Sequence, residues 1–131
     1  MENPGVMSLW IGNFKTKNNL KEYIEIKFDE VGDRIQSEFM NDFGMDFTSY
    51  NQDLLEISFR AIPTASLTTL LSGSSYESVI LLQFVEHYGE VFSETYDSVI
   101  KLYDFEYEGN INKVRFKDGN LTYLGSVYYE E

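Results

Sequence analysis

The sequence predicts an α+β fold, with a mainly antiparallel sheet of about five strands and one long and several short helices packed on it. Three observations lead to this fold class. A nearly continuous apolar run lies close to the N-terminus, a long helical pattern covers residues 75–88, and the last third of the chain alternates aromatic and polar residues. At 131 residues, 43% of them hydrophobic and 16% aromatic, the chain fits one domain spanning residues 1–131.

Several segments have the pattern of strands. Residues 6–14 are apolar at almost every position, so we expect this strand to be covered on both faces. Residues 54–59 alternate, and Pro63 is expected to end their pairing because proline has no N–H to donate. Residues 96–107 also alternate towards their end. The aromatic side chains expected on one face of this last segment are Tyr103, Phe105 and Tyr107.

The dipeptide Asp118-Gly119 predicts a hairpin with a two-residue type I′ turn. With this pair at the centre of the turn, Phe116 lies opposite Leu121 and the polar residues sort to the other face. The side chains expected to share the apolar face are Val114, Phe116, Leu121 and Tyr123.

The helices are marked by capping side chains and apolar spacing. In residues 37–43, Phe39 and Phe43 are four residues apart and should face the core. Ser74 and Glu77 match a capping box that opens the long helix over residues 75–88. This helix is apolar on more than one narrow stripe, so we expect deep burial. The side chains expected to cap the three short helices are Thr16, Ser37 and Ser66.

The charge balance limits the partners and the chemistry. With 22 acidic and 10 basic residues the net charge is −12, which disfavours nucleic acid and anionic membranes and favours a basic protein partner, or merely solubility. The chain has no cysteine and a single histidine, and its acidic residues do not match a calcium-binding loop. We therefore expect no cofactor and no metal site. No signal peptide or membrane span is visible, which predicts a cytoplasmic protein.

No sequence motif points to catalysis. Phosphate-binding glycine loops and the nucleophile elbow are missing, and His87 is explained by its place near the end of a helix. A pair of carboxylates acting as a hydrolase remains a weaker alternative. We therefore expect a protein without enzymatic activity, either an inhibitor or a small interaction domain for some basic partner.

Acidic residues are concentrated in residues 22–56, which hold ten of the 22 acidic residues and only two basic ones, Lys27 and Arg34. Turns and short helices display side chains better than core strands do, so this stretch is the expected binding surface. The competing interpretation is a solvated face without a partner. The residues expected to contact the partner are Asp29, Glu30, Asp33, Glu38, Asp42, Asp46, Phe47 and Tyr50.

Several segments together resemble a known family. These are MSLWIGNF at residues 7–14, FMNDFG at residues 39–44, and Pro63-Thr64 ahead of the helix LTTLL. The sequence is similar to the bacterial immunity protein 22 family, first catalogued as a domain of unknown function. The resemblance implies a small cytosolic protein of a polymorphic toxin system. Such proteins are encoded beside a toxin, which they bind and neutralise, and the toxins are expected to be mostly nucleases.

The charge and the resemblance lead to the same expectation. Nucleases bind polyanions through basic clefts, and an acidic inhibitor can occupy such a cleft with its own carboxylates. The resemblance brings no catalytic residues with it. The eight residues named above are therefore the expected toxin-binding residues, on the grounds of charge and aromatic content alone.

Overall fold

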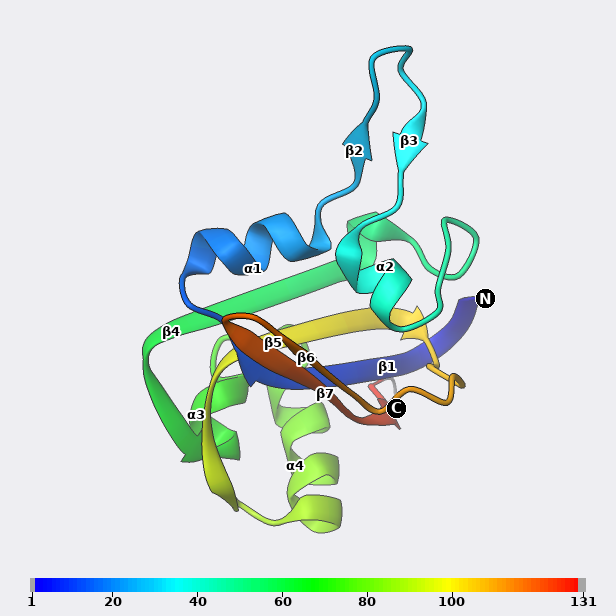
Figure 1. The fold of residues 1–131 in the computed structure, drawn as a ribbon. Helices are drawn as coiled ribbons and strands as arrows, with labels where there is room; N and C mark the ends of the chain where they lie inside the picture. The colour runs from blue at the N-terminus through cyan, green and yellow to red at the C-terminus, as the bar shows by residue number, and fades with distance from the viewer. Residues whose placement is uncertain (1, 130–131) are drawn as a thin grey trace.

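The computed structural model describes residues 2–129 and confirms the α+β class (Figure 1). Its main sheet has five strands in the order β4-β5-β1-β7-β6, and each neighbouring pair is antiparallel. The strands of this sheet are β1 (Glu2–Asn13), β4 (Leu55–Ser66), β5 (Val91–Phe105), β6 (Lys113–Phe116) and β7 (Gly119–Tyr128). A separate two-stranded sheet is formed by β2 (Lys27–Phe28) and β3 (Arg34–Ile35).

Helices cover both faces of the main sheet (Figure 1). They are α1 (Lys17–Ile24), α2 (Glu38–Asp42), the 3-10 helix η1 (Gln52–Leu54), α3 (Leu67–Leu71) and α4 (Glu77–Tyr88). One core lies between the sheet and α1 and α2, and a second lies between the sheet and α3 and α4. The β2–β3 hairpin projects away from both layers.

The central strand β1 contributes to both cores, as its sequence predicted. Trp10 packs in the core under α1 and α2, whereas Leu9 and Ile11 pack in the core under α3 and α4. All three side chains are buried. A strand with helices on both faces has no solvent side, which explains the continuous apolar run.

The caps of the three short helices are also confirmed. Each capping oxygen accepts a hydrogen bond from the backbone N–H three residues further on. The pairs are Thr16 with Asn19, Ser37 with Met40 and Ser66 with Thr69. Capping depends on neighbours in the chain, so the sequence predicts it well.

Strand β5 departs from the predicted alternation at Asp104. This residue has φ of 59°, a left-handed conformation that interrupts the two-residue period of a strand. Tyr103 therefore packs in the α3 and α4 core, whereas Phe105 and Tyr107 pack in the α1 and α2 core. The prediction that these three rings share one face is wrong. Asp104 Oδ1 accepts a hydrogen bond from the N–H of Gly5 at 3.0 Å, which ties this irregularity to β1.

Pro63 does not end β4, contrary to the prediction. The strand continues to Ser66, with a register shift between Phe59 and Thr64. Strand β4 is an edge strand of the sheet, and Pro63 lies within the register shift, between the paired residues Phe59 and Thr64. An edge strand tolerates a proline there because the missing N–H need not break a hydrogen bond between paired residues.

The β6–β7 hairpin has a different register from the predicted one. Phe116 pairs with Gly119 and Val114 pairs with Leu121, so the turn residues are Lys117 and Asp118. Neither turn residue has a positive φ, and the predicted type I′ turn is therefore wrong. The slip is two residues, so the predicted sharing of one face survives. The side chains that contact the α1 and α2 core are Val114, Phe116, Leu121 and Tyr123.

Close approach to β1 explains the glycine in this hairpin. A Cβ atom at Gly119 would overlap the carbonyl oxygen of Asn13 and lie 2.8 Å from Cε2 of Phe116. Gly119→Val is therefore expected to lower the free energy of unfolding by about 1–3 kcal/mol, measured by urea denaturation, because overpacking forces the backbone to shift. Lys117→Val in the same turn is the matched control and should change it by less than about 0.5 kcal/mol. Equal stability of Gly119→Val and the parent would contradict this close packing.

Helix α4 begins later and is more exposed than predicted. Its N-cap is Tyr76, in a left-handed conformation with φ of 58° and no side-chain cap. The predicted capping residue, Ser74, instead accepts a hydrogen bond from Lys101. Only Ile80 and Phe84 are buried in this helix, so the expected deep burial is wrong. The helix lies against α3 and β7, and its outer side faces solvent.

Candidate functional site

The β2–β3 hairpin is the most prominent feature of the acidic stretch. Lys27 pairs with Ile35 and Phe28 pairs with Arg34. The backbone N–H of Asp29 continues the ladder with a 2.9 Å hydrogen bond to the carbonyl of Asp33. In Figure 1 the hairpin stands out from the body above α1 and α2, and residues 27–35 are all exposed.

The side chain of Asp29 closes the tip of the hairpin. Its Oδ1 atom accepts hydrogen bonds from the N–H groups of Val31 at 3.0 Å and Asp33 at 2.9 Å. Gly32 has φ of 90°, which a residue with a Cβ rarely adopts. Asp29 therefore shapes the tip in addition to carrying charge.

Two contacts fasten the base of the hairpin to the body. The guanidinium carbon of Arg34 lies 4.2 Å from the centre of the Phe47 ring, a favourable cation–π distance. Gln52 Nε2 donates a 3.0 Å hydrogen bond to the carbonyl of Ile24, just before the hairpin. These contacts connect the hairpin to the segment that leads from α2 to β4.

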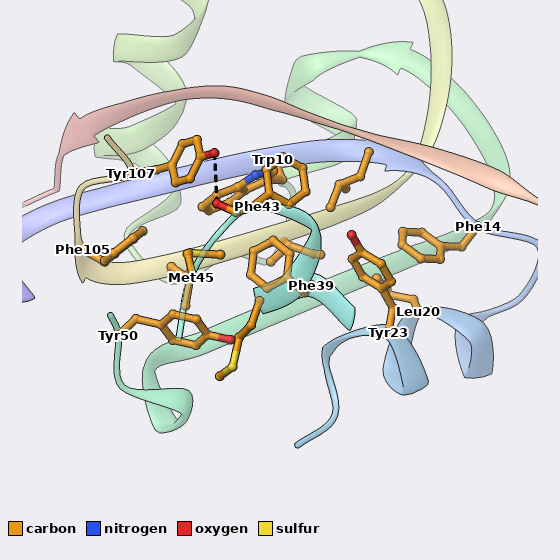
Figure 2. Close-up of a cluster of buried hydrophobic side chains, with 14 residues drawn as sticks. Trp10, Phe14, Leu20, Tyr23, Phe39, Phe43, Met45, Tyr50, Phe105 and Tyr107 are labelled. Atoms are coloured by element: carbon orange, nitrogen blue, oxygen red, sulfur yellow. Dashed lines mark hydrogen bonds between the residues drawn. The ribbon is translucent and has the colours of Figure 1, made fainter. Parts of the chain in front are cut away.

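Helix α2 carries the next part of the acidic stretch. Phe39 and Phe43 point inward, with ring centres 5.0 and 5.8 Å from that of Trp10 (Figure 2). Tyr50 lies in the same aromatic core and is 6% exposed. The expectation that Tyr50 presents its ring to a partner is therefore corrected, because the ring is a buried support of α2.

The six predicted acidic residues come from three neighbouring segments. Asp29, Glu30 and Asp33 belong to the hairpin, Glu38 and Asp42 to α2, and Asp46 to the turn that follows. All are exposed except Asp42, which is half-buried. The acidic residues therefore follow one another from the hairpin onto the adjoining helix and turn, which lie on one side of the sheet.

Some of these carboxylates also have structural partners. Asp42 accepts a 2.8 Å hydrogen bond from the hydroxyl of Tyr23; burial together with this carboxylate raises the pKa of Tyr23 far above its usual value. Hydrogen bonds from the hydroxyl and N–H of Thr48 lower the pKa of Asp46. The side chains of Glu30, Asp33 and Glu38 make no hydrogen bond or ion pair within the described part of the chain, so they are the best positions for testing charge.

Sequence reasoning missed three apolar side chains on the hairpin. Phe28 is 65% exposed, Val31 is 81% exposed and Ile35 is 47% exposed. Their signal in the sequence was their position: they lie in a short acidic segment around a Gly-containing turn, with too few residues to bury them.

A buried lysine lies away from this surface. Lys101 on β5 is 2% exposed, and its Nζ atom is 2.8 Å from Glu56 Oε1 and 2.5 Å from Ser74 Oγ. Burial lowers the pKa of Lys101 despite the attraction of Glu56. Burial acts to raise the pKa of Glu56, but the bonds from Lys101 and Ser75 outweigh it and lower the pKa. The lysine thus neutralises Glu56 and joins β4, β5 and the α3–α4 connection.

Within residues 2–129, no three side chains of the metal-binding types come together in a way that could hold an ion. None of the helices described is long and apolar enough to cross a membrane.

The fold and the surface define a small, strongly acidic α+β protein that presents a projecting hairpin. Comparison with protein families shows which family the chain belongs to. The family model described as Immunity protein 22 matches residues 7–130, and the chain belongs to this family. Membership confirms the resemblance seen in the sequence and supports a role in immunity to a toxin. Neither the curated proteins nor the solved structures that were compared include a match to the chain.

Proposed function

We propose that this chain is a non-enzymatic immunity protein that binds a cognate toxin in the cytoplasm and covers the toxin's basic active-site surface. We further propose that the toxin is a nuclease domain and that residues 1–131 act as one domain. The observation that carries the proposal is the match of the Immunity protein 22 family to residues 7–130. An inhibitor of this kind needs only a complementary surface and no catalytic group.

The net charge of −12 supports a basic partner. A nuclease must attract a polyanion, so its active site is lined by basic residues. The positive potential that attracts the nucleic acid substrate also attracts carboxylates on the inhibitor, which raises the association rate and selects the partner. Rapid capture matters when the free enzyme is lethal to the cell that makes it.

The proposed contact surface runs from the hairpin over α2 to the following turn. Phe47 is half-buried beneath Arg34 and supports the base of the hairpin. Tyr50 supports the surface from inside the core. The residues proposed to face the toxin are Asp29, Glu30, Asp33, Glu38, Asp42, Asp46 and Phe47.

Charge reversal of Glu30 and Asp33 tests the proposal. The double variant Glu30→Lys, Asp33→Lys is expected to associate with the toxin at least about tenfold more slowly at low salt. Added salt should shrink the difference, because exposed charges are screened over about 10 Å at 0.1 M ionic strength. Association rates would be measured by surface plasmon resonance with a catalytically inactivated toxin domain encoded beside the immunity gene. Asp29 is left unchanged because it holds the hairpin tip.

A matched control separates local charge from net charge. Glu86 on α4 and Glu94 on β5 are exposed and lie outside the acidic stretch. The variant Glu86→Lys, Glu94→Lys changes the net charge equally and should slow association much less. Equal slowing by the two variants would contradict the proposed surface. A folded parent that neither binds this toxin nor protects cells from it would contradict the proposed function and favour an interaction domain for another basic partner.

A further inference from the structure

We infer that the β2–β3 hairpin is an arm that enters the active-site cleft of the toxin, with Phe28, Val31 and Ile35 as its apolar anchors. The inference rests on the proposed function and adds the mode of binding to it. The acidic residues would guide the approach, whereas the apolar side chains would hold the complex together.

The first support is that three exposed apolar side chains lie on one small element, with Phe28 and Ile35 on opposite faces of the hairpin. Single exposed apolar residues are normal on any protein. Here a phenylalanine, a valine and an isoleucine, 65%, 81% and 47% exposed, occur together in one hairpin. A partner that buries them gains roughly 25 cal/mol for each Å² of apolar surface removed from water.

The second support is that the fold of the sheet does not use this hairpin. Strands β2 and β3 pair with each other in their own two-stranded sheet and not with the five-stranded sheet. Phe28, Val31 and Ile35 are absent from the residues packed in either core. Packing in the two cores therefore does not require these positions to be apolar, which supports a role for them in binding.

The third support is preorganisation. The Asp29 side chain closes the tip through the N–H groups of Val31 and Asp33. Arg34 against Phe47 fixes the base, with 4.2 Å between the guanidinium carbon and the ring centre. An arm that is ordered before it binds loses less conformational entropy in the complex.

Charge decides which occupant fits the arm. Asp29, Glu30 and Asp33 are interleaved with the apolar side chains, so a surface that covers them must offer cations. A second copy of this chain carries a net charge of −12 and would be repelled. A basic cleft of a protein provides both a concave shape for the arm and cations for its carboxylates.

The test removes the apolar side chains and keeps every charge. The triple variant Phe28→Ser, Val31→Ser, Ile35→Ser should bind the inactivated neighbouring toxin domain at least about 100-fold more weakly, mainly through faster dissociation. The association rate of the triple variant should depend on salt concentration in the same way as that of the parent. Amides of residues 27–35 should also gain protection from hydrogen exchange in the parent complex, a measurement that needs no variant.

The control removes apolar side chains that are equally exposed but lie elsewhere. Ile62 on β4 is 81% exposed and Leu82 on α4 is 62% exposed. The variant Ile62→Ser, Leu82→Ser should bind like the parent, and both variants should melt like it. If the parent binds the toxin and the hairpin variant binds equally well, the arm is overturned and the proposed function stands. If the folded parent does not bind the toxin at all, the proposed function fails and the arm fails with it.

Discussion

Replacing Phe43 by alanine is expected to lower the free energy of unfolding by about 3–5 kcal/mol, the usual cost of removing a buried phenylalanine. The ring is 1% exposed and is surrounded by other rings (Figure 2). Its centre lies 5.6 Å from that of Phe39, 5.8 Å from that of Trp10 and 5.9 Å from that of Tyr107. Urea denaturation monitored by circular dichroism would measure the loss.

The size of this loss follows from the packing of α2. The helix is short, so its own hydrogen bonds cannot maintain it, and Phe39, Met40 and the C-cap residue Phe43 pack it against the sheet. Phe28→Ala is the matched control, since this ring is mostly exposed on the hairpin; it should cost less than about 0.5 kcal/mol. A loss below about 1 kcal/mol for Phe43→Ala would show that α2 is not held by this core.

Local features of the fold could be predicted from the sequence because their causes lie within a few residues. The caps at Thr16, Ser37 and Ser66 depend on backbone groups three residues away. The burial of β1 on both faces follows from its own apolar run. These are the elements for which propensity, spacing and tertiary packing agree.

Errors in the predicted elements arose where a residue far away in the chain forms a contact that local patterns do not show. Ser74 has the right spacing to cap α4, but Lys101 takes its oxygen and the helix begins later. Asp104 lies in a segment with the pattern of a strand, but its backbone is left-handed and its side chain accepts a hydrogen bond from Gly5. The side chain of Phe105 therefore packs in the α1 and α2 core, whereas Tyr103 packs in the other core. Both cases involve a contact between residues far apart in the chain, and no short stretch of sequence shows such a contact.

The candidate site was predictable in charge but not in shape. The acidic residues of the hairpin and α2 were visible as a cluster in the sequence. The projection of the hairpin was not, because the sequence pattern does not show that β2 and β3 pair only with each other, apart from the main sheet. Tyr50 shows the opposite error, since an aromatic residue in a loop was expected at the surface and lies in the core. Exposure depends on the tertiary arrangement, which the sequence pattern alone does not supply.

Removing the charge of Glu56 is expected to lower the free energy of unfolding by about 2 kcal/mol, because Lys101 then stays buried without an opposite charge. Removing one partner of a fully buried ion pair costs about 3–5 kcal/mol, because the remaining charge stays buried without compensation. Lys101 is 2% exposed but Glu56 is 35% exposed, so solvent screens part of the interaction and reduces the expected cost. Glu56→Gln keeps the shape of the side chain, and urea denaturation at neutral pH measures the loss of charge.

A second variant and a change of pH identify the cause. Adding Lys101→Met to Glu56→Gln should recover much of the stability, since a buried pair replaced by apolar groups is often neutral. The pKa of Glu56 is lowered in the folded protein, so its contribution is fully present above the unfolded value of about 4.3 and is lost as the pH falls through the lower folded value. The gap between parent and Glu56→Gln should therefore close in acid. A gap that is zero at neutral pH, or that persists unchanged in acid, would mean that Lys101 does not depend on the charge of Glu56.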